Sequence, residues 1–407
     1  MNKLQNKKKH IVIVTTWFPP KIGVAVNRML SFAKYLSKDK YYISVITTSN
    51  KSNITPSIDN VSIYQLPNKQ LLKPPSFNND NFMIHKLKVL WKVFVHKLEP
   101  NDYKGWTKGS VFKLKEIHSK NPIDIIISSF SPVASHLIAL EFIKQHPSTK
   151  WVADMRDEMS ITPLIDEKTK TYYQSIEKEI NKYATALTSV SEPILTDFKK
   201  SLPDIPYYEE VRNGYDHELS FSNYNFNDVF TITYCGIFYG NIKPHTFFKA
   251  LLNYKNLKKE EFNFKIKFIG TPKNFTIPNE LKKHIHFYPK IKSDEAIQEM
   301  RNSDVNLLIN PSSGRKGVYT GKLFDYLSVG KPILGVVDVS DVAAEMIKEY
   351  NAGEIASFDN ILEIEKTIEK LHLKWLRKEK LTTDIEKIES LHRKHQVKKL
   401  EQLIDKL

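Results

Sequence analysis

The chain has 407 residues and a single cysteine, Cys235, inside a predicted strand. One cysteine excludes a disulfide framework and fits a reducing compartment. No run of ~18 apolar residues is present, so we expect no membrane-spanning segment. Internal repeats at solenoid periods and low-complexity tracts are also lacking, which excludes repeat architectures.

Positive charge, in contrast, is plentiful. Lysine and arginine outnumber aspartate and glutamate by 61 to 46, which gives a formal net charge of +15. Such a surface prefers anions, whether nucleotides, nucleic acid or anionic lipid headgroups. Hydrophobic residues make up 41% of the chain, enough for folded cores. A chain of this length is expected to form two domains of roughly 150–220 residues each.

The first half opens with a strand–helix–strand pattern. Residues 10–16 and 42–47 are predicted strands, and residues 25–37 form a predicted helix between them. This order predicts an α/β domain with a parallel, doubly wound sheet. Ligands of such sheets bind where the strands end. Gly23, in the loop after the first strand, therefore admits a phosphate or a sugar there, or only makes the turn.

Charged side chains gather at the end of a later predicted strand, residues 151–157. Asp154, Arg156 and Asp157 lie together there. Buried charges demand partners, and active clefts collect them. The pattern therefore indicates either part of an active cleft or a structural clamp between loops.

Residues 83–98 are predicted to form a basic amphipathic helix. Ile84, Leu87, Trp91 and Phe94 recur at helical spacing, with lysines between and around them. Such a helix either lies on an anionic membrane surface or packs its apolar face on its own domain.

The second half repeats the alternation of strands and helices. Predicted strands over 230–235 and 264–269 run into Gly236 and Gly270. We therefore predict a first doubly wound domain over 1–215, a second over 216–384, and a final amphipathic helix over 385–407. Lys243 follows the strand that ends at Gly236 and so belongs to the same sheet edge.

The most informative stretch is a predicted short helix after a buried strand over 305–309. Thr320 suits its N-cap, and the free N–H groups of its first turn suit a phosphate. Gly321 allows close approach, Lys322 adds a cation, and Asp325 is placed to accept from a ribose hydroxyl. Alternatively, Lys322 and Asp325 form an ordinary surface pair. In the first interpretation, Lys243 and Lys322 converge on a diphosphate.

Six segments, taken in order, carry a family resemblance. They are residues 17–23, 101–106, 131–136, 154–157, 213–216 and 320–332. Together they resemble the GT-B-fold glycosyltransferases of glycosyltransferase family 4, of the bacterial capsule, O-antigen and exopolysaccharide type. The resemblance covers nearly the whole chain. It implies two Rossmann-like domains that face each other across a cleft, with the C-terminal helix crossing back to the first domain.

The resemblance also implies an activity. Retaining, metal-independent family members transfer a hexosyl or N-acetylhexosaminyl group from a nucleotide sugar, here UDP- or GDP-linked, without a further cofactor. The acceptor would be an oligosaccharide, most often lipid-linked. The expected location is cytoplasmic and peripheral, on the inner face of the bacterial plasma membrane through residues 83–98, with no nucleic-acid partner.

Roles for particular residues follow from the same resemblance. The donor would contact Gly236, Gly270, Tyr319, Thr320, Gly321, Lys322 and Asp325; the acceptor would contact Gly23, Asp154 and Arg156; and the catalytic set would be Lys243, Lys322, Arg156 and Asp157. Arg156 is expected to orient groups or stabilise charge, because arginine is not a base at neutral pH. Gly317 stands where many family members have a glutamate that contacts the donor sugar.

Two other functions stay open from the sequence. A sugar-nucleotide epimerase of the same fold would recruit Asp154, Asp157 and His136 as acid–base groups. A non-catalytic binder of anions or nucleic acid is suggested by the net charge of +15 and by adjacent aromatic and basic residues such as Trp91 and Lys92.

Overall fold

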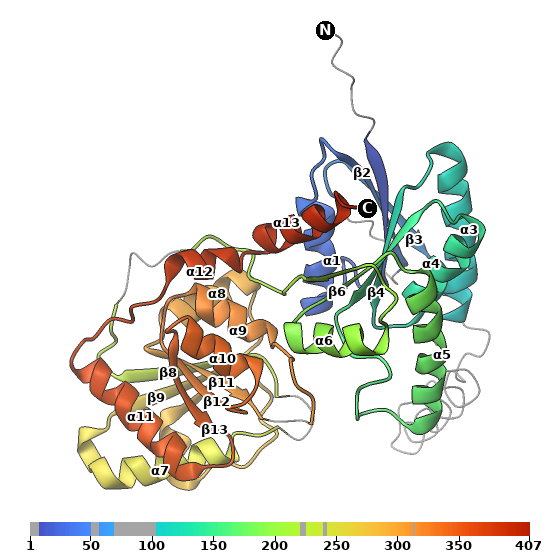
Figure 1. Ribbon diagram of the computed structural model, residues 1–407. Helices are drawn as coiled ribbons and strands as arrows, with labels where there is room; N and C mark the ends of the chain where they lie inside the picture. Colours follow the sequence, from blue (N-terminus) through green and yellow to red (C-terminus); the bar gives the residue numbers. More distant parts are fainter. Residues whose placement is uncertain (1–7, 50–56, 69–102, 220–224, 239–241, 312–313) are drawn as a thin grey trace, which may run out of the picture. The chain divides into compact units, whose positions relative to one another are not determined.

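The structure is a computed structural model that describes residues 8–49, 57–68, 103–219, 225–238, 242–311 and 314–407 (Figure 1). The chain divides into two compact units. Unit 1 comprises Met1–Arg212 with Gln396–Leu407, and unit 2 comprises Asn213–His395. The helix predicted over 83–98 lies outside the described residues. No helix in the described ranges has the length and apolar character needed to cross a membrane.

Unit 1 is built on a seven-stranded sheet in the order β3-β2-β1-β4-β5-β6-β7, and every adjacent pair is parallel. Its strands are β1 (Lys9–Val14), β2 (Tyr41–Thr48), β3 (Val61–Leu66), β4 (Ile125–Phe130), β5 (Lys150–Met155), β6 (Ala186–Ser189) and β7 (Tyr207–Glu210). Its helices include α1 (Val24–Tyr35), α3 (Lys104–Lys120), α4 (Ala134–Gln145), α5 (Glu167–Tyr183) and α6 (Glu192–Ser201). The central strands are buried along almost their whole length because both faces of the sheet are covered.

Unit 2 is built on a six-stranded parallel sheet in the order β10-β9-β8-β11-β12-β13. Its strands are β8 (Phe230–Cys235), β9 (Phe264–Ile269), β10 (Ile285–Tyr288), β11 (Val305–Asn310), β12 (Ile333–Val337) and β13 (Gly353–Ser357). Its helices include α7 (His245–Lys258), α8 (Ser293–Arg301), α9 (Gly321–Ser328), α10 (Val342–Glu349), α11 (Ile361–Leu376) and α12 (Ile385–Ser390). The predicted α/β class with two doubly wound sheets is confirmed.

The single helix predicted over 385–407 is wrong, because the structure has two. After α12 the chain turns, and α13 (Arg393–Ile404) begins. At the break Arg393 N donates to Tyr215 O at 3.0 Å, and a Cβ on Gly214 would lie 2.0 Å from Leu391 O. Contact with this neighbouring segment replaces the continuation of the helix.

The part of α13 that belongs to unit 1 completes that unit's core. Val397, Leu400 and Ile404 are buried with residues of β1, β2 and α1. At the rim, Lys40 Nζ pairs with Asp405 Oδ2 at 2.8 Å. Figure 1 shows α13, in red, beside α1, in blue.

Candidate functional site

In unit 2, three neighbouring strands end at the same edge of the sheet. Gly236 follows β8 and its N–H donates to Ile269 O at 2.8 Å, while Gly270 follows β9 and donates to Tyr288 O at 3.0 Å. Their φ angles are 106° and 68°, a region that favours glycine. Thr271 Oγ1 donates to Gly236 O at 2.6 Å and fixes the first of these turns. Two hydrogen-bonded glycine turns therefore form this edge.

Lys322 belongs to the first turn of α9, and its side chain extends over this edge. Its Nζ is 3.4 Å from Ile237 O and 4.9 Å from the centre of the Tyr234 ring. A Cβ added to Gly236 would lie 2.8 Å from Lys322 Cε, so glycine at 236 makes room for the lysine. Burial lowers the pKa of Lys322 to about 8. The structure thus brings together two residues predicted to bind the donor.

The N-terminus of α9 is not closed by its own N-cap residue. Thr320 occupies the N-cap position with extended backbone, as predicted, but its side chain makes no capping hydrogen bond. Its Oγ1 is buried without a hydrogen-bond partner among the residues that the structure describes. Tyr319 packs its ring 5.5 Å from that of Phe324. The first-turn N–H groups of α9 and a buried hydroxyl therefore lie together at the sheet edge.

Asp325 lies one turn further along α9. Its carboxylate accepts no hydrogen bond within the part of the chain that the structure describes. Burial raises the pKa of Asp325 to about 6, although Arg393 and Lys322 act in the opposite direction. Lys322 and Asp325 are each partly buried, so they are not the fully exposed surface pair that was the alternative from sequence.

Lys243 lies at the same edge but has a different partner. Its Nζ donates to Asn274 Oδ1 at 3.2 Å, in the loop after β9. Gly317, the other notable position, has a φ of 83° and donates its N–H to Asp341 Oδ1 at 2.7 Å. Asp341 also caps α10. The sequence analysis missed Asp341, although an aspartate before the helix over 342–349 is an N-cap signal.

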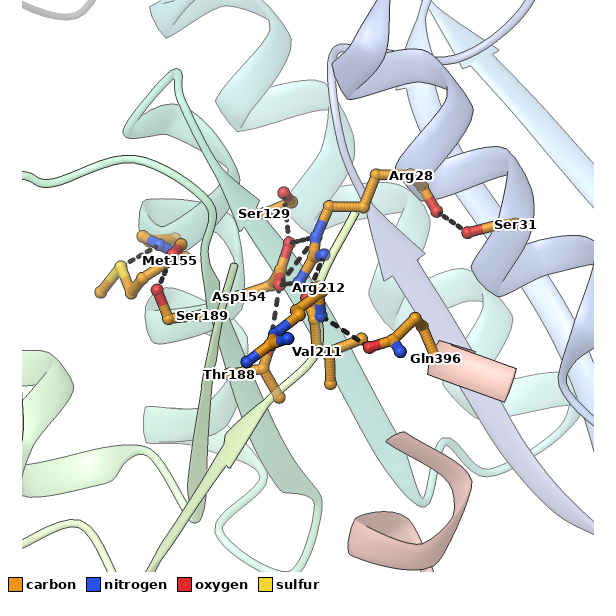
Figure 2. A network of polar contacts seen from close by, with 11 residues as sticks. Arg28, Ser31, Ser129, Asp154, Met155, Thr188, Ser189, Val211, Arg212 and Gln396 are labelled. Carbon is orange, nitrogen blue, oxygen red and sulfur yellow. Dashed lines mark hydrogen bonds and ion pairs between the residues drawn. The ribbon is translucent and has the colours of Figure 1, made fainter. Parts of the chain in front are cut away.

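In unit 1, Asp154 is the residue before the last in β5, at the corresponding sheet edge. Figure 2 shows Arg28, from α1, reaching it: Arg28 Nη2 donates to Asp154 Oδ1 at 2.6 Å. Thr188 and Ser129 donate to its two oxygens at 2.8 Å each. Burial alone would raise the pKa of Asp154, but Arg28 and the two hydroxyls lower it. Asp154 is 0% exposed, so no acceptor can touch it in this structure.

Arg156 and Asp157 are accessible at this edge. Arg156 Nη2 donates to Ser131 O at 2.8 Å, and Trp17 Nε1 donates to the same oxygen at 2.8 Å. Arg156 Nη1 lies 3.5 Å from Asp157 Oδ2, and the two side chains are 16% and 39% exposed. The loops after β1, β4 and β5 therefore meet around one carbonyl, with an arginine and a carboxylate at the surface.

Gly23 lies in the same loop as Trp17, at the start of α1. It is the N-cap of α1, with a φ of 149°, and a Cβ built there meets no atom of the described residues within 4 Å. Ile22 beside it is 83% exposed. Within the described ranges, the start of α1 thus has no side chain packed over it.

His136, which the epimerase alternative requires, is buried. Its Nδ1 is 2.7 Å from Ser128 Oγ and its Nε2 is 3.3 Å from Met155 Sδ. Burial lowers its pKa to about 4. Since Asp154 is also buried, two of the three acid–base groups of that alternative cannot reach a sugar. No cluster of His, Cys, Asp or Glu within the described ranges is arranged to hold a metal ion.

No family model and no curated protein matches the sequence. Solved structures match almost end to end. Sucrose-phosphate synthase from Thermosynechococcus elongatus aligns with a TM-score of 0.67 at 11% identity, covering 98% of this chain and 99% of that one. The lipopolysaccharide outer core galactosyltransferase WaaB aligns with a TM-score of 0.62 at 14% identity, covering 98% of this chain and 100% of that one. HepE from Anabaena, in complex with UDP-glucose, aligns with a TM-score of 0.62 at 13% identity, covering 98% of this chain and 100% of that one. The chain therefore has the GT-B fold.

Proposed function

We propose that this chain is a glycosyltransferase. It takes a sugar from a nucleoside-diphosphate sugar bound at the carboxyl edge of the unit 2 sheet. It passes that sugar to a saccharide acceptor bound at the carboxyl edge of the unit 1 sheet.

The arrangement around Lys322 is the observation that carries this proposal. A desolvated cation lies against the Gly236 turn at an uncapped helix N-terminus, which suits a diphosphate. Asp325, whose carboxylate has no hydrogen-bond donor among the described residues, follows one turn later and suits a ribose hydroxyl. HepE, which has a similar structure, was solved with UDP-glucose and with UDP and glucose, which supports a nucleotide-sugar donor.

The chemistry requires stabilisation of a leaving group. When the bond between the sugar and the diphosphate breaks, the electron pair goes to a phosphate oxygen. Lys322, Lys243 and the N–H groups of α9 would stabilise that negative charge. In this scheme these protein groups supply all the positive charge that the leaving group requires, and no metal ion takes part.

The acceptor hydroxyl then bonds to the sugar carbon and loses its proton to the departing phosphate oxygen on the same face, which retains the configuration. Arg156 and Asp157, with the open space beside Gly23, would orient the acceptor. Asp154 would act indirectly, by tying β5 to α1.

The narrower assignment is a role in bacterial surface polysaccharide synthesis on a lipid-linked acceptor. The net charge of +15 supports work at an anionic surface. The proposed membrane contact through residues 83–98, the hexosyl or N-acetylhexosaminyl donor, and family 4 membership belong to the same proposal.

Calorimetric titration with UDP, GDP, dTDP, CDP and ADP tests the donor site. We expect one nucleotide to bind in the micromolar range and Lys322→Ala to weaken it by about 1.5–3 kcal/mol, as for a charged hydrogen bond. Lys348→Ala, at an exposed position in α10, is the matched control and should bind normally. Failure of all five nucleotides to bind would overturn the proposal.

Product analysis separates transfer from epimerisation. A transferase consumes the donor sugar in proportion to added saccharide acceptor. Conversion of the sugar nucleotide to an isomer without acceptor would instead favour the epimerase.

A further inference from the structure

A cavity of about 300 Å³ lies at the amino ends of β1, β2 and β3, bordered by the C-terminal end of α3. It is at the opposite end of the unit 1 strands from Gly23 and Arg156. Its lining includes His10, Tyr42, Ser44, Ser62, Tyr64 and Glu116. The proposed transfer reaction uses none of these residues.

The strand register explains why these side chains meet. His10 pairs with Tyr42, and Ser44 pairs with Ser62. Side chains two residues apart on a strand share a face, and paired residues of adjacent parallel strands share it too. One face of the sheet is therefore polar and aromatic at its amino end. A helix-covered face is normally apolar.

The floor of the cavity is a neutral histidine held on both sides. His10 Nδ1 is 3.1 Å from Asn121 O, and Nε2 is 2.9 Å from Ser44 Oγ. A carbonyl only accepts, so Nδ1 carries the proton and Nε2 accepts from the Ser44 hydroxyl. The lone pairs of Ser44 Oγ then remain to accept from a ligand.

The rim carries aromatic rings and groups that both donate and accept. Tyr42 is 53% exposed and Tyr64 is partly buried. Neither phenol makes a hydrogen bond within the described residues, and the same holds for the side chains of Asn60 and Ser62.

The cations around the cavity already have partners. Glu116 is paired with Lys113 and, at 2.9 Å, with Lys120. Lys113 Nζ also lies 5.6 Å from the centre of the Tyr64 ring. Lys8 Nζ lies 5.5 Å from the centre of the Tyr42 ring and donates to Lys38 O at 2.7 Å. Each of these cations has a partner in the protein, so the cavity is not a dedicated anion site.

We propose that this cavity is a second saccharide-binding site, separate from the site of transfer. A neutral sugar has a C–H face that packs on an aromatic ring and a rim of hydroxyls that both donate and accept. Tyr42 and Tyr64 would take the ring, and Ser44, Ser62 and Asn60 the hydroxyls. A phosphate or a nucleic acid would need unpaired cations instead.

The test is binding of the full chain to an array of neutral mono- to hexasaccharides. We expect binding that falls at least tenfold in the double variant Tyr42→Ala/Tyr64→Ala. Tyr207→Ala, 39% exposed on β7 of the same sheet, is the control and should bind normally. Lys322→Ala should lose nucleotide affinity yet keep glycan binding, so the two proposals can fail independently.

A second variant guards against misfolding of the first. Ser62→Gln places bulk in the cavity from an exposed position and should also reduce binding at least tenfold. The proposal is overturned by no binding to any neutral glycan, by equal binding of Ser62→Gln and the unmodified chain, or by binding only to sulfated glycans that salt abolishes.

Discussion

The carboxyl edges of the two sheets each hold an aspartate, Asp154 buried and Asp325 partly buried, and the two differ in their hydrogen-bond partners. Asp154 in unit 1 accepts from Arg28, Ser129 and Thr188, and its pKa is lowered. Asp325 in unit 2 accepts no hydrogen bond from a described residue, and burial raises its pKa to about 6. Hydrogen bonds within unit 1 satisfy the Asp154 carboxylate, whereas the Asp325 carboxylate is offset by the charges of Arg393 and Lys322 without a hydrogen bond from a described residue.

This difference distinguishes charged side chains that stabilise the fold from charged side chains that are available to a ligand. A network whose donors and acceptors are all matched stabilises the folded state and has little left to offer a substrate. An unmatched buried charge costs stability and is retained where a ligand supplies the partner. The comparison gives four predictions.

Breaking the matched network should have the largest effect. Arg28→Ala leaves the Asp154 charge buried without its cation and should cost about 3–5 kcal/mol of unfolding free energy. Chemical denaturation measures it. The double variant Arg28→Met/Asp154→Leu removes both charges and should recover a large part of the loss. If the single and the double variant lose the same unfolding free energy, the loss comes from packing and not from the unpaired charge.

Neutralising Asp325, the carboxylate without hydrogen-bond donors among the described residues, should increase the unfolding free energy. The folded-state pKa of Asp325, about 6, exceeds the ordinary 3.8. Protonated Asp325 therefore favours the folded protein, and this contribution to the unfolding free energy is lost as pH rises through about 6. Asp325→Asn stays neutral and should raise the unfolding free energy by about 1–3 kcal/mol at pH 7.5. The gain should shrink at pH 4.5.

The same variant should bind the nucleotide more weakly, because the ribose loses its acceptor. Thermal unfolding at the two pH values and calorimetry on one preparation measure both effects. A variant that is less stable at pH 7.5 than the unmodified chain would contradict this account of Asp325.

The pKa of Lys322, about 8, predicts how donor affinity depends on pH. Above pH 8 the free lysine loses its proton and must regain it to bind a diphosphate. Affinity should then fall by up to tenfold per pH unit, which is about 1.4 kcal/mol. Lys322→Arg stays charged and should lack this alkaline fall. Titrations at pH 7, 8 and 9 measure it, and parallel curves for the two proteins would exclude Lys322 as the titrating group.

The smallest effect is expected at the helix N-caps. Thr320→Ala removes a hydroxyl that makes no capping bond, so stability should change by less than about 0.5 kcal/mol. Asp166 caps α5 by accepting from Thr169 N at 2.8 Å, so Asp166→Ala should cost about 1 kcal/mol. Thermal unfolding compares the two. A larger loss in Thr320→Ala would mean that its hydroxyl has a structural role.

Local sequence patterns were enough to predict the class of the fold. The apolar run over 305–309 and the short helix after it are present as β11 and α9. Gly330 follows the end of α9 with a φ of 67°, as expected for a residue just beyond a helix. These features depend on neighbouring residues, which periodicity and turn chemistry describe well. β3 and β7 were not predicted, because they are short or only partly buried edge strands.

Partners distant in sequence were beyond prediction. Asp154 was grouped with Arg156, two residues away, whereas its cation is Arg28, 126 residues away. Whether the hydroxyl of Thr320 caps α9 also depends on its side-chain orientation, which the residue type does not determine. The site could therefore be located at a sheet edge, but its pairing required the structure.

The return of the chain to unit 1 has a consequence for synthesis on the ribosome. Residues of α13 that complete the unit 1 core, such as Val397 and Leu400, are translated only after the whole of unit 2. Domains usually fold in the order in which they emerge. Here the unit that begins first is completed last, so unit 2 is free to fold while the apolar surface of α1 and β1 still awaits its cover.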